Sequence, residues 1–250
     1  LESSDDQVSL DEKVARDYIA SGDADLIVNI VDASNIERNL YLTSQLLEMR
    51  VPMIVALNMM DIVRQRNIKI DVAHFSAQLQ CPVIPLSAAK KTGLKDLKLA
   101  IANAAQQKSV PAVDLHYPLA LEQGIDALSA VLMKRGGVIS ADRRWLALRL
   151  LEDDTLALQL AGHDILPSVS TIQSRIEQEC GEEIDILAAD ARYGFVHALT
   201  QAAVSRHSDV GRRTTDKIDR IVLNRFLGIP IFLFVMYAMF MFTINIGSAF

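Results

Sequence analysis

The sequence is poor in residues that bring metals, disulfides or nucleic acid to a protein. It has two cysteines, Cys81 and Cys180, five histidines and one tryptophan in 250 residues. The cysteines lie far apart, and no histidine stands at metal-ligand spacing from a cysteine or another histidine. We therefore predict no metal site and a reduced compartment, in which the cysteines act as small apolar residues. The formal net charge of −6 argues against a nucleic-acid partner.

Residues that handle phosphate are also missing. No Gly-x-x-x-x-Gly-Lys-Ser/Thr and no Asp-x-x-Gly occurs, so the phosphate cradle, its lysine and the Mg²⁺ ligands are absent. No nucleophile paired with a base stands out either. The first residues, 1–6, contain neither a signal segment nor an initiator Met. We expect the chain to begin after the phosphate-binding half of a longer protein, and to hydrolyse nothing unaided.

The most informative stretch is an apolar run, Met53–Leu57, which Pro52 precedes and Asn58-Met59-Met60-Asp61 follows. Such a run predicts a buried strand of a parallel sheet, and ligands bind beyond the carboxyl ends of these strands. Asn58 and Asp61 have the spacing of the guanine-reading Asn-Lys-x-Asp motif of GTPases. A plain turn with an asparagine helix cap is the alternative.

Hydrogen-bond chemistry fits a guanine site. A carboxylate at position 61 can accept from both N1–H and the N2 amine of guanine, and the Asn58 amide can serve N7 and join neighbouring loops. Adenine presents a lone pair at N1 and has no N2 amine, so a site built to pair the guanine edge can reject it strongly.

A second strand end supports the same interpretation. The apolar segment Cys81–Leu86 runs into Ser87-Ala88-Ala89-Lys90, which resembles the Ser-Ala-Lys motif whose small residues let a backbone N–H approach guanine O6. Two base-reading elements after two successive strands favour a nucleotide site. The candidate base-binding residues are Asn58, Met59, Asp61, Ser87, Ala88 and Ala89.

The order of elements predicts an α/β unit, a partial GTPase-type parallel sheet with flanking helices. Capping boxes at Ser9/Glu12 and Ser34/Glu37 predict two of its helices. The segment between the strand at 53–57 and the helix at 72–79 is predicted to be a polar surface segment. The other expected elements are a helix over about 10–20, a strand over 26–31, a helix to about 49, a strand at 83 and a helix over 94–107.

Beyond a linker at 110–118 the pattern is helical, with no convincing strand, and predicts an all-α bundle. Its acidic groups at 152–154 and 182–183 are predicted to be solvated helix ends, and Trp145 a core anchor. The expected domains are 1–110, the C-terminal part of a GTPase domain; 118–207, a helical domain; 208–225, a cytoplasmic connector; and 226–250, a first transmembrane helix. The bundle helices are expected over 119–134, 142–151, 155–161, 168–180 and 183–206.

The transmembrane prediction rests on composition. No charged residue occurs from Phe226 to Phe250, and about 20 apolar residues suffice to cross a bilayer. Basic residues precede this stretch, which places the preceding domains in the cytoplasm. A buried hairpin of a soluble interaction module is the alternative.

Several segments together resemble the bacterial ferrous iron transport protein B family. They include Val31-Asp32-Ala33-Ser34-Asn35, Ala56-Leu57-Asn58-Met59-Met60-Asp61 and Ala189-Asp190-Ala191-Arg192-Tyr193. Further matching segments are Ser9-Leu10-Asp11-Glu12, Ser21–Leu26, Glu37–Leu42, Thr215–Arg220 and Leu227-Gly228-Ile229-Pro230, so the resemblance covers essentially the whole chain.

This resemblance implies a GTPase domain, a helical domain that favours the GDP-bound state, and a polytopic domain in the bacterial inner membrane that moves Fe²⁺ inward. It implies GTP or GDP and Mg²⁺ as cofactors, with the Mg²⁺ ligands upstream, and Fe²⁺ as the transported substrate. The implied partners are a guanine nucleotide, the lipid bilayer, small cytoplasmic proteins of the same transport system and further copies of the chain. A regulatory GTPase anchored in the membrane, without transport, is the rival. One departure from most GTPases is Met59, where a lysine usually stacks on the base.

Overall fold

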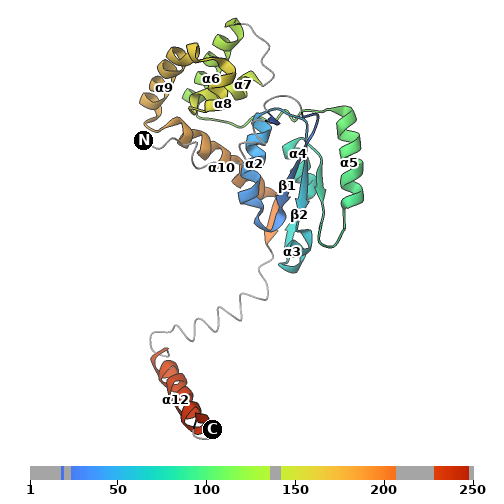
Figure 1. The fold of residues 1–250 in the computed structure, drawn as a ribbon, viewed down its shortest axis with the longest axis vertical. Helices are drawn as coiled ribbons and strands as arrows, with labels where there is room; N and C mark the ends of the chain where they lie inside the picture. The colour runs from blue at the N-terminus through green and yellow to red at the C-terminus, as the bar shows by residue number, and fades with distance from the viewer. Residues whose placement is uncertain (1–17, 20–23, 136–141, 207–227, 248–250) are drawn as a thin grey trace. The chain divides into compact units, whose positions relative to one another are not determined.

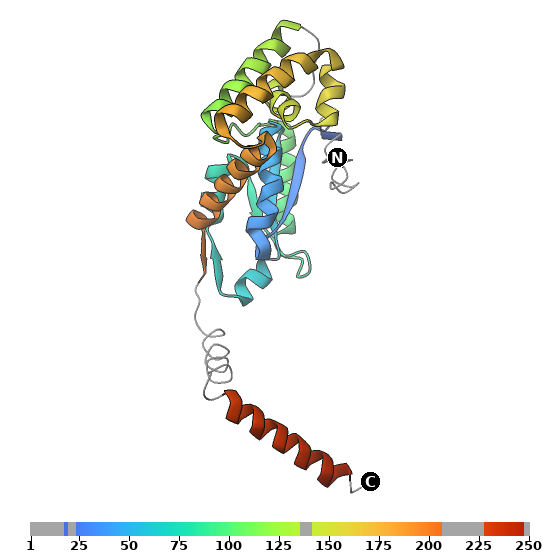
Figure 2. The ribbon, with the colours of Figure 1, turned by 90° about the vertical axis from the view of Figure 1, so that its left-hand side faces the viewer.

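The computed structural model describes residues 18–19, 24–135, 142–206 and 228–247 (Figures 1 and 2). Contacts divide the chain into two units, Leu1–Ser205 and Arg206–Phe250, and each is described here by itself. Predictions for the helix at 10–20, its capping box and the connector at 208–225 lie almost wholly outside the described residues.

The centre of the first unit is a three-stranded sheet in the order β1-β2-β4. Its strands are β1 (Ile27–Asp32), β2 (Met53–Asn58) and β4 (Val83–Pro85), and both neighbouring pairs are parallel. Met53 to Leu57 are all buried, because β2 is the central strand with packing on both faces. The predicted partial parallel sheet is thus confirmed.

Helices flank this sheet, and in Figure 1 it lies between α2 and α5. Asp71 caps α4 by accepting from the His74 N–H at 2.9 Å, so a local signal defines that start. The flanking elements are η2 (Ala33–Asn35), α2 (Ile36–Glu48), α3 (Met60–Gln65), α4 (Val72–Leu79) and α5 (Leu94–Gln107).

One prediction for this region is wrong. Ser34 does not cap α2: Asp32 caps the preceding 3-10 turn by accepting from the Ser34 N–H at 2.8 Å, and Asn35 makes no side-chain cap bond. The segment after β2 is largely exposed, as predicted, with Arg64, Arg66 and Lys69 at the surface, and it contains α3 and the short strand β3 (Ile68–Ile70).

The helical part follows the linker and encloses Trp145, which is 1% exposed, as predicted. Helices α6 and α9 approach closely at Gly124, where a Cβ would lie 2.5 Å from Ile176 Cδ1. The elements of this part are α6 (Leu119–Arg135), α7 (Arg143–Leu151), α8 (Thr155–Ala161), η3 (His163–Ile165), α9 (Leu166–Cys180) and α10 (Ile184–Ala203).

The last helix of the bundle leads back to the α/β part. Helix α10 packs along α2, and the rings of Tyr193 and Tyr41 lie 4.7 Å apart. The chain then forms β5 (Val204–Arg206), which pairs with β3 in a second, two-stranded sheet. The helix predicted to reach 206 therefore ends at Ala203, and the prediction of no strand in this half is wrong.

The second unit contains α12, Gly228–Gly247. Within the ranges that the structure describes, no helix combines the length and the apolar character needed to cross a membrane. Residues 226–227 and 248–250 of the predicted span lie outside those ranges, and the transmembrane helix over 226–250 stays a prediction.

Candidate functional site

The two predicted base-reading segments meet at one edge of the sheet. Leu57 in β2 pairs with Pro85 in β4, and the Leu86 N–H donates to the Leu57 carbonyl at 2.8 Å. Parallel strands end at the same edge, so Asn58 and Ser87 emerge side by side. The sheet itself thus brings together residues that lie far apart in the sequence.

Side chains then join the two segments in what we call the base-site cluster, Asn58, Asp61, Ser87 and Ala88. The Ala88 N–H donates to Asn58 Oδ1 at 3.0 Å, and the Ser87 hydroxyl donates to Asp61 Oδ1 at 2.8 Å. Four of the six predicted residues are therefore joined in two hydrogen-bonded pairs across the two strand ends.

Asp61 is held ready to accept hydrogen bonds. The hydrogen bond from the Ser87 hydroxyl is the main cause that holds the pKa of Asp61 below its usual range, against an opposing effect of burial; the Lys90 ammonium, 3.7 Å from Oδ2, adds a smaller lowering effect. The carboxylate is therefore ionised at neutral pH. An ionised carboxylate is what the two donors of a guanine edge require.

The loop that carries Ser87 and Ala88 is closed by backbone hydrogen bonds between its two ends. Ser87 and Thr92 exchange backbone hydrogen bonds, each 3.1 Å long. Gly93 ends the loop at φ +77°, where a Cβ would lie 2.4 Å from the Pro85 carbonyl oxygen, so only glycine fits. This closure fixes where the Ala88 N–H points.

The other two predicted residues lie at the rim. Met59 has left-handed backbone geometry, with φ 64° and ψ 25°, and is 40% exposed at the start of α3. Ala89 is exposed. Met59 therefore stands where the usual lysine would, with its thioether chain open to solvent and free to pack against a flat ligand.

No metal site accompanies this cluster in the described part of the chain. Among those residues, no group of three or more His, Cys, Asp or Glu side chains could hold a metal ion. The donors present among those residues do not fit the Mg²⁺ of a GTPase.

Sequence analysis missed a buried charged cluster, which we call the junction network: Glu48, Tyr117, Arg149, Glu152 and Arg192. Arg192 donates to both oxygens of Glu48, at 2.7 and 3.0 Å, and to both oxygens of Glu152, at 2.8 and 3.1 Å. Its side chain is only 3% exposed. This guanidinium joins α2 of the α/β part to α10 and the end of α7.

Two further groups complete the junction network. Arg149 lies 3.2 Å from Glu152 and 3.6 Å from Glu48, and the Tyr117 hydroxyl donates to Glu48 at 2.5 Å. Burial raises the pKa of Glu152, but the attraction of Arg149 and Arg192 outweighs burial and the net shift is downward. Glu152 was predicted to be solvated; it is buried and ionised because two cations face it.

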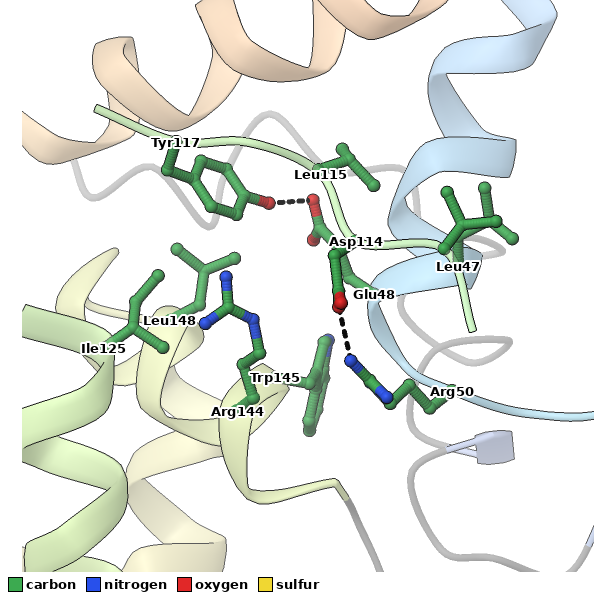
Figure 3. A pocket seen from close by; sticks show the side chains of 11 residues that line it. Leu47, Glu48, Arg50, Asp114, Leu115, Tyr117, Ile125, Arg144, Trp145 and Leu148 are labelled. Atoms are coloured by element: carbon green, nitrogen blue, oxygen red, sulfur yellow. Dashed lines mark hydrogen bonds and ion pairs between the residues drawn. The ribbon is translucent and has the colours of Figure 1, made fainter. Parts of the chain in front are cut away.

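A small hollow lies beside this network, between α2, the linker and α7 (Figure 3). Trp145 lines it, and its indole N–H has no hydrogen-bond acceptor among the described residues. Arg50 pairs with Asp114 and Arg144 with Glu122 at the rim. The charges of the lining are thus already paired, which distinguishes this hollow from the open base-site cluster.

The sequence matches two known protein families. Residues 4–101 match the family described as ferrous iron transport protein B, and residues 117–205 match the FeoB cytosolic helical domain. The Fe(2+) transporter FeoB of Escherichia coli K12 is 45% identical over 243 residues, which cover 97% of this chain and 31% of that protein. The chain thus spans about a third of the length of the curated relatives it matches.

Solved structures agree with the sequence comparison. A GDP-bound variant of the S. thermophilus FeoB G-domain has 34% identity and a TM-score of 0.70, covering 79% of this chain and 76% of that one. The mGMPPNP-bound NFeoB of S. thermophilus has 34% identity and a TM-score of 0.69, covering 81% and 76%. The shared architecture is an α/β G-domain of GTPase fold followed by a helical domain.

Proposed function

The chain belongs to the ferrous iron transport protein B family, and from that premise we propose that it reads the guanine base of GTP or GDP through the base-site cluster. Asp61 accepts from N1–H and the N2 amine, Asn58 holds the neighbouring loop, and the Ala88 region approaches O6. Met59 packs on the base, and Ala89 borders it.

One observation carries this proposal. Ser87 and Asn58 each form a hydrogen bond that joins the two strand ends, so Asp61 presents a fixed, ionised carboxylate whose side chain stays 13% exposed. A plain turn needs no such bonds between segments. The relatives whose printed names include GDP or mGMPPNP support the same ligand class for this chain.

At the level of the whole protein, we propose regulation of Fe²⁺ uptake across the bacterial inner membrane, with this chain at the cytoplasmic face. GTP hydrolysis and Mg²⁺ binding require phosphate-site residues that the sequence motifs of this chain do not supply. The 45% identity to an Fe(2+) transporter favours transport over the rival of an anchored regulatory GTPase. The proposal includes the division of the chain into a G-domain part at 1–110 and a helical domain at 118–207. It also includes small cytoplasmic proteins and further copies of the chain as binding partners.

The test uses nucleosides, because they probe base recognition without the phosphates. Amide NMR spectra of the chain are recorded with guanosine, inosine and adenosine. We expect guanosine to shift the amides of residues 58–61 and 87–89. Inosine lacks the N2 amine and loses one charge-assisted hydrogen bond, so its Kd is expected to be about 10-fold higher or more. Equal binding of guanosine and adenosine would overturn the proposal.

A substitution gives the sharper control. Asp61→Asn replaces an acceptor by a donor, so it is expected to weaken guanosine binding about 10- to 100-fold and to favour xanthosine, which has a carbonyl in place of the N2 amine. Asp185→Asn removes the same charge at an exposed position of α10 and is expected to change neither affinity. Unchanged guanosine binding by the Asp61 variant would contradict the proposed site.

A further inference from the structure

The short strand β5 follows the helical part and returns to the α/β part. It pairs with β3, and the Asp71 N–H, directly after β3, donates to the carbonyl of Ala203, directly before β5, at 2.8 Å. The end of β3 thus lies beside the start of β5. Strand β5 therefore runs back toward the turn that precedes β3.

Strand β3 is in turn tied to Asp61. Helix α3 carries Asp61 in its first turn, and only Arg66 and Asn67 separate its end from β3. Val63 in α3 is 1% exposed, so the helix is packed into the core rather than free at the surface. A change in the position of α3 therefore reaches β3 through a short, packed segment.

The middle of α10 is held by contacts with α2. Arg192 binds Glu48 of α2 through two hydrogen bonds in a buried environment, and further along α10 His197 Nδ1 lies 3.0 Å from Glu37. Helix α10 is about 30 Å long and lies along α2 for much of this length. Because it is held at the junction network, α10 cannot slide to absorb a displacement at its C-terminal end.

We propose that the β3–β5 pair is the coupling element between base occupancy and the chain that leaves the first unit at Arg206. Guanine binding holds Asp61 and α3 in one position, and that position keeps β3 paired with β5. When the base leaves, α3 is less restrained and β5 separates more often. This inference rests on the proposed guanine site. It states that guanine binding at that site controls the pairing of β5 with β3.

Thermodynamic linkage between ligand binding and strand separation gives the size of the expected effect. If separation of β5 from β3 disrupts the base site, a ligand at ten times its Kd must suppress that separation about 10-fold. Amide hydrogen exchange of residues 68–70 and 204–205 is therefore expected to slow about 10-fold in the full chain with saturating guanosine. Adenosine at the same concentration is the control and should leave exchange unchanged.

Reciprocity supplies a second test, because coupling acts equally in both directions. Asp71→Pro removes the N–H that donates to Ala203, whereas Asp71→Ala loses the same helix cap but keeps this N–H. The φ of Asp71, −82°, is close to what proline adopts. We expect guanosine to bind the Pro variant at least about 3-fold more weakly than the Ala variant, and exchange at 204–205 to be faster.

The outcomes separate the two proposals. Guanosine binding that depends on Asp61, with exchange at 68–70 and 204–205 unchanged and equal affinity of the Pro and Ala variants, would overturn the coupling and leave the base site standing. Absence of guanosine binding would overturn both. The exchange measurement uses the unmodified chain, so poor folding of the Pro variant does not prevent a decision.

Discussion

The base-site cluster and the junction network are both polar and both join distant parts of the sequence, but they are built in opposite ways. In the base-site cluster, neutral donors hold one carboxylate whose side chain is 13% exposed, with a lysine near its second oxygen. In the junction network, two carboxylates and two guanidiniums are 3–12% exposed and pair with one another, and of these groups the Arg149 Nε–H has no acceptor among the described residues.

This difference teaches how to tell a binding site from a structural joint. A ligand site keeps an unsatisfied acceptor accessible, because the ligand must complete it. A joint completes its own hydrogen bonds, and removing one partner leaves a buried charge uncompensated. The four predictions below test this contrast, from the largest expected effect to the smallest.

Arg192→Met is expected to lower the free energy of unfolding by about 3–5 kcal/mol at pH 7, because Glu48 and Glu152 lose their main cation. Urea unfolding measures the change. Arg175→Met, at an exposed position in α9, is the matched control and should have almost no effect. An equally small loss in the free energy of unfolding for both variants would show that the junction network does not stabilise the fold.

The loss of stability caused by Arg192→Met should depend on pH in a defined direction. In the unaltered chain the pKa of Glu152 is lowered, so its stabilisation is present above the usual carboxyl pKa and is lost as pH falls through the lower folded value. Without Arg192, burial dominates and this pKa rises. The destabilisation by Arg192→Met should therefore shrink as pH falls from 7 toward about 4.5, which unfolding at several pH values will show.

Tyr117→Phe removes one hydrogen bond to Glu48 and leaves the ion pairs intact. We expect a loss of about 1–2 kcal/mol in the free energy of unfolding, less than for Arg192→Met. The two substitutions combined should cost less than the sum of their separate effects, since both act on Glu48. Strict additivity in urea unfolding would speak against a single network.

Ser87→Ala should change binding rather than stability. The hydroxyl is the main cause of the lowered pKa of Asp61, so that pKa is expected to rise toward its usual value. Guanosine affinity should fall by about 3- to 10-fold at pH 7, and on acidification binding should fail at a higher pH than in the unaltered chain. Titrations by NMR between pH 7 and about 4 would reveal identical profiles if Ser87 plays no part.

Sequence patterns predicted the elements whose signals are local. The helix at 72–79 begins after a capping aspartate, and the helix at 94–107 begins after a glycine that the turn requires. The strand at 53–57 is a continuous apolar run. The four bonded residues of the base-site cluster were also predictable, because they lie at or within three residues of the ends of β2 and β4, and parallel strands end at one edge.

The remainder depends on contacts between distant segments. Strands β3 and β5 have three residues each, and each is defined by its partner rather than by its own composition. Arg192 likewise gave no signal of its own, because a single arginine in a helix is usually solvated. Its role follows from Glu48 and Glu152, which lie on two other elements.

Strand β1 has a practical consequence. It forms an edge of the three-stranded sheet, and Ile30 within it is 66% exposed. Among the described strands only β2 pairs with β1, and an apolar edge strand of this kind is a template for a strand of another molecule. Concentrated solutions of this chain should accordingly self-associate along β1, and a lysine at position 30 is the substitution that would keep the chains apart.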